Sequence, residues 1–197
     1  MASQTVIFIG PQGSGKGTQL DSLKERLTVQ TPDQKTVTLQ SGSLFRAFAS
    51  GASYTGSRIA ESINTGMLQP LFLSVGLWSR EMIDKVDLDC NILIDGFPRT
   101  VDEAHVLDTA LSFYRREHVE VIVLLADEDV VRKRMYARAR EDDTPEAIER
   151  RLLWYRTETK AVLEYLESNP RYVLHKIDAL REIDIVRADI EVALNVA

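Results

Sequence analysis

The sequence predicts an α/β fold in which a five-stranded parallel sheet is covered by helices on both faces, as a three-layer sandwich. Three observations lead to this prediction. Short runs of β-branched and apolar residues alternate along the chain with longer segments of helical spacing. The short runs are apolar at successive positions, which is typical of strands buried on both faces. The first run ends in a glycine-rich turn that leads directly into a helical segment.

The predicted strands are short, and each is separated from the next by helical or irregular segments. The first stops at Gly10 and is followed by a predicted helix from Gly15 to about Leu27. In three later segments, apolar residues recur with the spacing of one helix face. The predicted strands are residues 5–9, 36–39, 92–94, 119–125 and 172–177. The later helical segments are residues 104–114, 148–166 and 183–194.

Two segments depart from this alternation. Residues 41–67 are rich in glycine and serine, and residues 132–143 are rich in arginine. Both are expected at the carboxyl ends of the strands, where ligands bind in open α/β folds. We therefore expect one domain over residues 1–197, with a small helical lobe at about 41–67 and a short lid at about 132–143. The core of the domain comprises residues 1–40, 68–131 and 144–197.

The composition indicates a globular protein of a reducing compartment. Of the 197 residues, 44% are hydrophobic and 27% charged, which suffices for an apolar core. Because 30 Asp and Glu outnumber 24 Lys and Arg, the net charge of -6 argues against a broad nucleic-acid-binding surface. The single cysteine, Cys90, excludes an intramolecular disulfide and a cysteine-based zinc site. Without an apolar run of membrane-spanning length, we expect a cytoplasmic protein with no membrane or nucleic-acid partner.

The glycine-rich turn after the first strand predicts a phosphate site. Residues 10–16 read G-P-Q-G-S-G-K, which matches the P-loop pattern G-x-x-x-x-G-K between a strand and a helix. Glycines let backbone N–H groups surround a phosphate, the helix N-terminus adds its positive dipole, and Lys16 adds a full charge. A hydroxyl residue usually follows this lysine, whereas here Gly17 does and Thr18 comes next. The candidate phosphate-binding residues are Gly13, Ser14, Gly15, Lys16, Gly17 and Thr18.

Two motifs resemble those of the adenylate kinases and related nucleoside monophosphate kinases. The loop G-P-Q-G-S-G-K-G-T-Q resembles their G-x-P-G-x-G-K-G-T-Q, with Gln12 in the place of the proline, and residues 95–100 read D-G-F-P-R-T. The resemblance implies a P-loop kinase fold whose loop binds ATP. It also implies that Asp95 binds Mg²⁺ through water and that Arg99 grips the α-phosphate of the acceptor. A strand-end carboxylate and a guanidinium fork are suited to these two roles.

The segment 41–46, S-G-S-L-F-R, resembles the T-G-D-L-L-R that opens the acceptor-binding lobe of the same kinases. We expect Leu44, Ala47 and Phe48 to form an apolar helix face opposite Arg46, the second ligand of the acceptor phosphate. Ser41 keeps the hydroxyl of the family's threonine, which favours an adenine acceptor over a pyrimidine. The acceptor-binding residues implied by the resemblance are Ser41, Arg46, Leu68, Gly96, Arg99, Glu103, Arg140 and Arg151.

Glu103 stands three residues after the D-G-F-P-R-T motif, where the family usually has a glutamine that reads adenine. An ionised carboxylate only accepts hydrogen bonds, so Glu103 suits the neighbouring donors of guanine better than the N1 lone pair of adenine. The alternative is a first-turn helix residue that points to solvent and is stabilised by the helix dipole. Glu103 therefore leaves AMP and GMP both open as the acceptor.

Five cations lie within the nine residues 132–140, beyond the fourth predicted strand. A charge run is usually a solvated face. Here R-E-D-D at 140–143 and R-L at 151–152 resemble the lid of the family, shortened and without cysteines for a structural zinc. The resemblance implies that Arg134 lies against the donor base of ATP and Arg138 on its phosphates. The catalytic set that it implies is Lys16, Arg99, Arg140 and Arg151.

The function that the resemblance implies is the reversible, Mg²⁺-dependent transfer of a phosphoryl group from ATP to AMP, and its family leads us to expect a monomer. Within the kinases, GMP is an alternative acceptor because of Glu103, whereas Ser41 disfavours UMP and CMP. A P-loop regulatory NTPase is an alternative from another class, although the chain has no N-K-x-D motif for guanine. A binding protein without catalysis is disfavoured, because all the phosphate-binding arginines are present.

Overall fold

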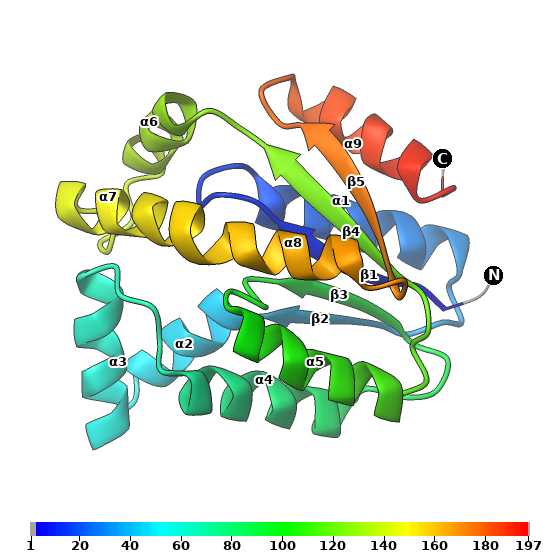
Figure 1. Ribbon diagram of the computed structural model, residues 1–197, viewed down its shortest axis with the longest axis horizontal. Helices are drawn as coiled ribbons and strands as arrows, with labels where there is room; N and C mark the ends of the chain where they lie inside the picture. Colours follow the sequence, from blue (N-terminus) through cyan, green and yellow to red (C-terminus); the bar gives the residue numbers. More distant parts are fainter. Residues whose placement is uncertain (1–2, 197) are drawn as a thin grey trace.

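A parallel sheet forms the centre of the computed structural model, which describes residues 3–196 (Figure 1). Its strands lie in the order β2-β3-β1-β4-β5, and all neighbouring strands are parallel. The expected fold class and the five expected strands are confirmed, with ends that differ by at most one residue. The strands are β1 (Thr5–Ile9), β2 (Thr36–Gln40), β3 (Asn91–Asp95), β4 (Val119–Leu125) and β5 (Tyr172–Asp178).

Helices cover both faces of the sheet, and further helices lie beyond the carboxyl ends of the strands (Figure 1). α1 and α9 pack on one face, and α4, α5 and α8 pack on the other. Within the described residues, no helix is both long enough and apolar enough to cross a lipid bilayer. The helices are α1 (Lys16–Gln30), α2 (Ser41–Ala49), α3 (Tyr54–Asn64), α4 (Leu71–Lys85), α5 (Val101–Phe113), α6 (Glu128–Arg138), α7 (Pro145–Trp154), α8 (Lys160–Ser168) and α9 (Ile183–Ala193).

The central strand β1 is buried along its whole length. Val6 and Phe8 belong to the apolar core beneath α1 and α9, whereas Ile7 and Ile9 belong to the core beneath α4, α5 and α8. This alternation follows from the period of a strand, which points successive side chains to opposite faces. Each such fully buried side chain contributes roughly 1.5–3 kcal/mol of hydrophobic stabilisation. The buried strand β1 therefore fixes the position at which the following loop begins.

The carboxyl ends of β1, β3 and β4 meet at one edge of the sheet, because the register pairs Phe8 with Asp95 and Ile9 with Val123. After β1 the chain forms β2 and β3 on one side of it, and then crosses to form β4 on the other side. Such a reversal of strand order opens a crevice outside the carboxyl ends of the strands. The loop after β1 and the turn after β3 both enter this crevice.

The long helix expected over residues 148–166 is divided in the structure. α7 ends at Trp154, the π-helix η1 (Tyr155–Thr159) follows, and α8 begins at Lys160. The expected apolar face is retained on both sides of η1, where it is buried. Tyr155 and Thr159 instead line the cleft described below. A π-turn inserts extra residues into a helix and is frequent at functional sites.

α2 buries a different face from the one expected. Ser41 and Phe45 are its buried residues, whereas Ala47 and Phe48 are exposed. The predicted apolar face through Leu44, Ala47 and Phe48 is therefore wrong. Because α2 contacts both α3 and α4, its orientation is set by two neighbouring helices and not by one apolar stripe.

Candidate active site

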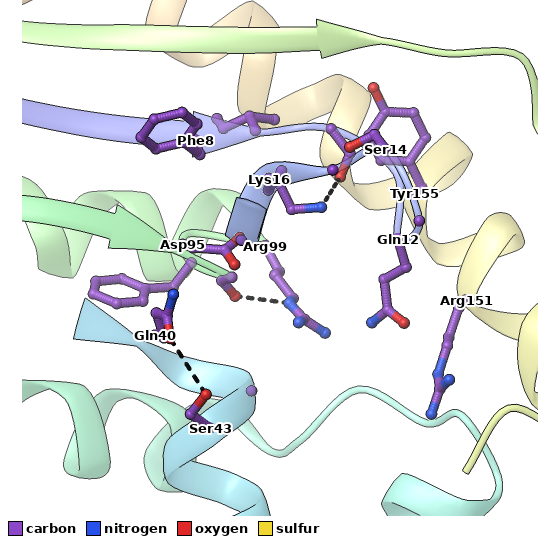
Figure 2. A pocket seen from close by; sticks show the side chains of 18 of the residues that line it. Phe8, Gln12, Ser14, Lys16, Gln40, Ser43, Asp95, Arg99, Arg151 and Tyr155 are labelled. Atoms are coloured by element: carbon purple, nitrogen blue, oxygen red, sulfur yellow. Dashed lines mark hydrogen bonds between the residues drawn. The ribbon is translucent and has the colours of Figure 1, made fainter. Parts of the chain in front are cut away.

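A cleft of about 800 Å³ opens at the carboxyl edge of the sheet, lined by the loop after β1, the α2–α3 lobe and the α6–α7 segment (Figure 2). Basic side chains from each of these parts line it, although the whole protein is acidic. Such local positive charge makes the cleft a site for a polyanion. Among residues 3–196, the lining cations are Lys16, Arg46, Arg99, Arg134, Arg138, Arg140, Arg151 and Arg181.

Most of the expected site residues are brought together on the wall of this cleft. They come from segments of the chain that are far apart in sequence, so the fold and not a single motif assembles the site. The expected residues that line the cleft are Gly13, Ser14, Gly15, Lys16, Gly17, Thr18, Arg46, Leu68, Asp95, Gly96, Arg99, Arg134, Arg138, Arg140 and Arg151.

The phosphate loop has a backbone that only glycine adopts easily. Gly13 has a φ of 87°, and Gly15 is the N-cap of α1 with a φ of 96°. A Cβ atom at Gly13 would lie 2.7 Å from the carbonyl oxygen of Val131, so glycine also permits the close approach of the loop to α6. The first N–H groups of a helix lack intrahelical partners, and α1 begins on the cleft wall. Its N-terminus can therefore bind a phosphate.

The ammonium group of Lys16 is held against the loop. Nζ donates hydrogen bonds to the carbonyl oxygens of Gly10 and Pro11, at 2.8 and 2.9 Å. Burial lowers the pKa of Lys16 from 10.5 to about 8; the charge of Asp95 opposes this shift, and nearby arginine charges add to it. A bound phosphate would add a second negative charge to that of Asp95 beside this half-buried cation.

Asp95 ends β3 next to the phosphate loop. Its Oδ1 atom is buried without a hydrogen-bond partner in the described structure, and so is Oγ of Ser14. Both residues line the cleft. Buried oxygen atoms are costly unless water or a ligand satisfies them, and oxygen is the ligand that Mg²⁺ prefers. The residues present therefore fit a Mg²⁺ ion that is held through water.

Arg99 lies on the turn between β3 and α5. Its Nε donates to the carbonyl oxygen of Gly96 at 2.7 Å, which aims the guanidinium into the cleft (Figure 2). Phe97 in the same turn stacks on Trp78 of α4, with ring centroids 4.9 Å apart. Burial lowers the pKa of Arg99, against the charges of the carboxylates nearby. The turn is thus fixed, and the cation on it is poorly hydrated and available to an anion.

Ser41 was expected to contact the acceptor, but it does not line the cleft. Its side chain is buried, and Oγ donates to the carbonyl oxygen of Gly96 at 2.8 Å. The hydroxyl therefore ties the start of α2 to the turn after β3, and the structure gives no support to its direct contact with a ligand.

Glu103 is also absent from the cleft wall, although it was expected there as a base-reading residue. The alternative of a solvent-facing side chain is wrong, because only 3% of Glu103 is exposed. Oε1 accepts hydrogen bonds from Ser74 Oγ at 2.5 Å and Trp78 Nε1 at 3.0 Å, and Oε2 accepts from the backbone N–H of Arg99 at 2.7 Å. The carboxylate thus joins α4 to the turn that carries Arg99.

Two acids orient Arg138 at the end of α6 and Arg151 of α7. Asp143 accepts hydrogen bonds from Arg138 Nε and Nη2 at 2.6 and 2.9 Å, and from Arg151 Nη1 at 2.7 Å. Arg151 also pairs with Asp142. Burial would raise the pKa of Asp143, but the hydrogen bonds and charges of the arginines around it hold this pKa below its usual value. The guanidinium groups of Arg138 and Arg151 are therefore held in place without a ligand.

Arg140 lies among cations in the cleft. Burial lowers its pKa, and the charges of Arg138 and Arg46 lower it further, against the opposing charges of the two lid acids. A cluster of like charges is unfavourable unless an anion binds to it. The cluster of Arg46, Arg138 and Arg140 therefore indicates where phosphate groups would bind.

The remaining cations of the segment 132–143 divide between two environments. Arg134 lines the cleft and donates through Nη1 to the carbonyl oxygen of Ala179 at 3.0 Å, which connects α6 to the loop after β5. Arg132 pairs instead with Glu149 of α7, through Nε at 2.6 Å. It is not among the residues that line the cleft. Only part of the arginine-rich segment thus faces the cleft.

The helix after the lid also contacts the lobe across the cleft. Arg150 Nη1 donates to the carbonyl oxygen of Thr65 at 2.6 Å, and Arg151 Nη2 donates to that of Ile63 at 3.1 Å. α7 therefore touches the lobe through the same residue, Arg151, that binds the lid acids.

Several polar residues on the cleft wall were not assigned a role from the sequence, among them Gln12, Gln69 and Arg181. Arg181 follows the carboxyl end of β5, and that position was the one signal available for it. Gln12 is visible in the sequence as a departure from the proline of the loop pattern. Gln69 belongs to no motif of its own.

Comparison with known proteins decides the family. Residues 8–171 match the sequence model of adenylate kinase. The chain belongs to the adenylate kinase family. It is 32% identical over 183 residues to an adenylate kinase of Rhodococcus erythropolis, covering 93% of this chain and 94% of that protein. It is 33% identical over 197 residues to one of Thermus thermophilus, covering 98% of both, and 30% identical over 200 residues to one of Methylorubrum extorquens, covering 96% and 95%.

As a member of the adenylate kinase family, the chain is a phosphotransferase of the nucleoside monophosphate kinase class. The matched range includes the phosphate loop, the turn with Arg99 and the arginines around Asp143. These are the parts that line the cleft. The family therefore favours a kinase over the regulatory NTPase and the binding protein that the sequence left open.

Proposed function

We propose that the protein transfers the γ-phosphoryl group of ATP to AMP, with Mg²⁺, and forms two molecules of ADP. One observation carries the proposal: the cations of the cleft come from both of its sides and meet beside the phosphate loop. Two polyphosphate chains brought together repel each other, and positioned cations remove that repulsion. Catalysis of this kind consists of positioning and charge neutralisation, so no general base is needed.

ATP is proposed to lie along the phosphate loop. Gly13 to Thr18 would bind its β- and γ-phosphates through backbone N–H groups and Lys16. Arg138 would bind the same phosphates, and Arg134 would lie against the base next to Ala179. The buried, unpartnered Oδ1 of Asp95 supports a place for Mg²⁺ there, held through water. Mg²⁺ would neutralise charge on the phosphate oxygens of ATP.

AMP is proposed to lie between the lobe and the turn after β3. Arg46 and Arg99 would bind its phosphate, with Leu68 and Gly96 against the nucleoside. Ser41 and Glu103 would act on this site through Gly96 and Arg99 and not by contact. Because Glu103 already accepts three hydrogen bonds, it lacks the free lone pairs to take both donors of guanine. This supports AMP over GMP.

The transfer itself is proposed to use Arg140 and Arg151. An oxygen of the AMP phosphate forms a bond to the γ-phosphorus of ATP, while the bond from that phosphorus to the bridging oxygen breaks. Charge on the moving group spreads over its three outer oxygens. Arg140 and Arg151 would neutralise this charge, and closure of the lid and lobe would exclude water.

A product assay tests the proposal. Mg·ATP is incubated with AMP, GMP, CMP and UMP in parallel, and each diphosphate is resolved. We expect ADP from AMP, at a rate that greatly exceeds that of the other diphosphates. A preference for GMP would contradict the inference from Glu103, and ATP binding without any product would refute the kinase.

Variants test the assignment of the site. Lys16→Ala and Arg99→Ala are each expected to lower kcat/KM by about 10²-fold or more, because each removes a cation from the reacting phosphates. Arg132→Ala is the matched control. Arg132 lies in the arginine-rich segment 132–143, but its side chain pairs with Glu149 and does not line the cleft. The fall in kcat/KM of Arg132→Ala is expected to stay within about fivefold. Equal losses in all three variants would refute the assignment.

A further inference from the structure

The loop glutamine Gln12 stands where the related loop pattern has proline. It is half-buried on the cleft wall, between Pro11 and Gly13. Figure 2 shows its side chain extending from the loop into the cleft, into the space toward which Arg99 and Arg151 also extend. The loop pattern has proline at this position, so Gln12 adds a polar side chain inside the cleft where the phosphates are proposed to bind.

Among residues 3–196, the side-chain amide of Gln12 has no hydrogen-bond partner. In the part of the chain that the structure describes, each other glutamine makes a side-chain hydrogen bond. Gln69, which lines the same cleft, donates to Ser62 Oγ at 2.6 Å, and Gln19 donates to the carbonyl oxygen of Ile183 at 3.0 Å. No such bond forms at Gln12, so both its donor and its acceptor are free for a ligand.

The backbone carbonyl groups next to Gln12 already accept hydrogen bonds from Lys16. Lys16 Nζ binds the carbonyl oxygens of Gly10 and Pro11, the two residues that precede Gln12. A phosphate that engages Lys16 would therefore lie close to the start of the Gln12 side chain. The amide can donate to a phosphate oxygen without adding to the crowded positive charge of the cleft, and a proline has no donor to offer.

We propose that Gln12 is a catalytic residue whose Nε2–H group donates a hydrogen bond to the phosphoryl group in transit. This proposal rests on the proposed function. The amide keeps its protons throughout: the acceptor oxygen forms the new bond to phosphorus, and the bridging oxygen of ATP leaves with the electron pair of the old one. Because charge on the outer phosphoryl oxygens is what the amide binds, the bond contributes most when the group lies between donor and acceptor.

The test compares Gln12→Ala and Gln12→Glu with the unmodified protein in kcat, in the KM for AMP and in the Kd for ATP without acceptor. Loss of one hydrogen bond to a charged group predicts a fall in kcat of about tenfold for Gln12→Ala. The Kd for ATP is expected to change by less than about twofold. Gln12→Glu has the same shape but places a negative charge against the phosphates, so its kcat is expected to fall by about 10²-fold or more. Gln12→Pro, which restores the pattern, is expected to behave like Gln12→Ala.

Gln34→Glu is the matched control, because it adds the same charge in the loop before β2, where Gln34 donates to the carbonyl oxygen of Asp89. Its kcat is expected to stay unchanged. Unchanged kcat in Gln12→Ala and Gln12→Glu would overturn the proposal while leaving the kinase intact. A loss of ATP affinity that parallels the loss of kcat would also overturn it, because the side chain would then only shape the loop. Absence of ADP from ATP and AMP in the unmodified protein would refute the proposed function itself.

Discussion

The carboxylate of Glu103 accepts a hydrogen bond of 2.7 Å from the backbone N–H of Arg99, four residues earlier in the chain. The same carboxylate accepts from Ser74 and Trp78 of α4, so it joins this helix to the turn after β3. Glu103 also supplies a negative charge near the guanidinium of Arg99, which is half-buried. In the proposed acceptor site, Glu103 would therefore be a positioning residue that acts through Arg99.

Glu103→Gln is expected to weaken AMP binding without creating a new base preference. The amide oxygen of the variant can accept from α4, but its NH₂ group then faces the N–H of Arg99, and that donor is left unpaired. We expect a loss of about 1–3 kcal/mol of stability and a rise of about fivefold in the KM for AMP, with little change for ATP. Asp102→Asn, at the exposed neighbouring position, is the control. A switch of preference between GMP and AMP would show that Glu103 reads the base.

Lys16 is expected to make ATP binding sensitive to alkaline pH. In the protein without ligand its pKa is lowered to about 8. ATP needs the charged form, so its Kd is expected to rise by about tenfold between about pH 8 and about pH 9.5. Lys16→Arg stays charged in this range, and its Kd is expected to be flat with pH. A pH-independent Kd in the unmodified protein would contradict the prediction.

The same group has the opposite effect on folding. Between pH 8 and 10.5, the unfolded chain still binds the proton that the folded protein has lost at Lys16. The contribution of Lys16 to the free energy of unfolding therefore rises with pH across this window. Chemical denaturation of the ligand-free protein at several pH values, compared with Lys16→Met, measures it. A contribution that falls with pH would refute the burial of the charge.

Gly66 is expected to tolerate no side chain. Its φ is 70°, and a Cβ atom would lie 2.5 Å from the carbonyl oxygen of Ala147 in α7. Gly66→Ala should cost about 2 kcal/mol of stability and raise the KM for AMP, because the lobe must move away from α7. Gly76→Ala is the control: it lies within α4, where a Cβ atom meets open space, so alanine should stabilise by about 0.5–1 kcal/mol. Equal effects at both glycines would contradict the prediction.

Asp143→Asn is expected to disorganise the arginines of the cleft. The side chain of Asp143 is 1% exposed. The substitution by asparagine removes its negative charge, so Arg138 and Arg151 lose their buried ionic partner. We expect the free energy of unfolding to fall by about 3 kcal/mol at neutral pH, together with a clear fall in kcat. Asp129→Asn, whose side chain is 87% exposed, should change stability by less than about 1 kcal/mol.

The loss of stability at acidic pH also tests the interaction of Asp143 with Arg138 and Arg151. The folded-state pKa of Asp143 lies below its ordinary value of 3.8, so its contribution is complete above that value and is lost as pH falls through the folded-state pKa. Asp143→Asn should therefore lose less stability on acidification than the unmodified protein does. Parallel acid limbs would exclude this role.

The sequence predicts the sheet well, because each strand is a local run whose apolar residues face both layers. β1 and β4 have the bounds expected of them. The phosphate loop and the turn with Arg99 are local as well, since their backbone conformation is encoded by adjacent glycines and Pro98. Where neighbouring residues in the chain determine the geometry, the prediction succeeds.

Side-chain directions that depend on distant helices could not be predicted. Glu103 turns inward because Ser74 and Trp78, more than twenty residues earlier, offer donors to it. The burial of Phe45 instead of Phe48 depends on how α3 and α4 lie against α2. The π-turn at Tyr155 leaves the apolar spacing on either side intact, so periodicity alone gives no sign of it.

The contacts of α7 with the lobe link the two halves of the cleft energetically. Arg150 and Arg151 donate to the carbonyl groups of Thr65 and Ile63, so the helix that carries the proposed phosphoryl ligand Arg151 also contacts the wall of the proposed AMP site. If one nucleotide strengthens these contacts, it raises the affinity for the second, and thermodynamic reciprocity requires the second to raise the affinity for the first by the same factor. Under that condition, the two hydrogen bonds from α7 to the lobe backbone would make the binding of the two unlike substrates positively cooperative.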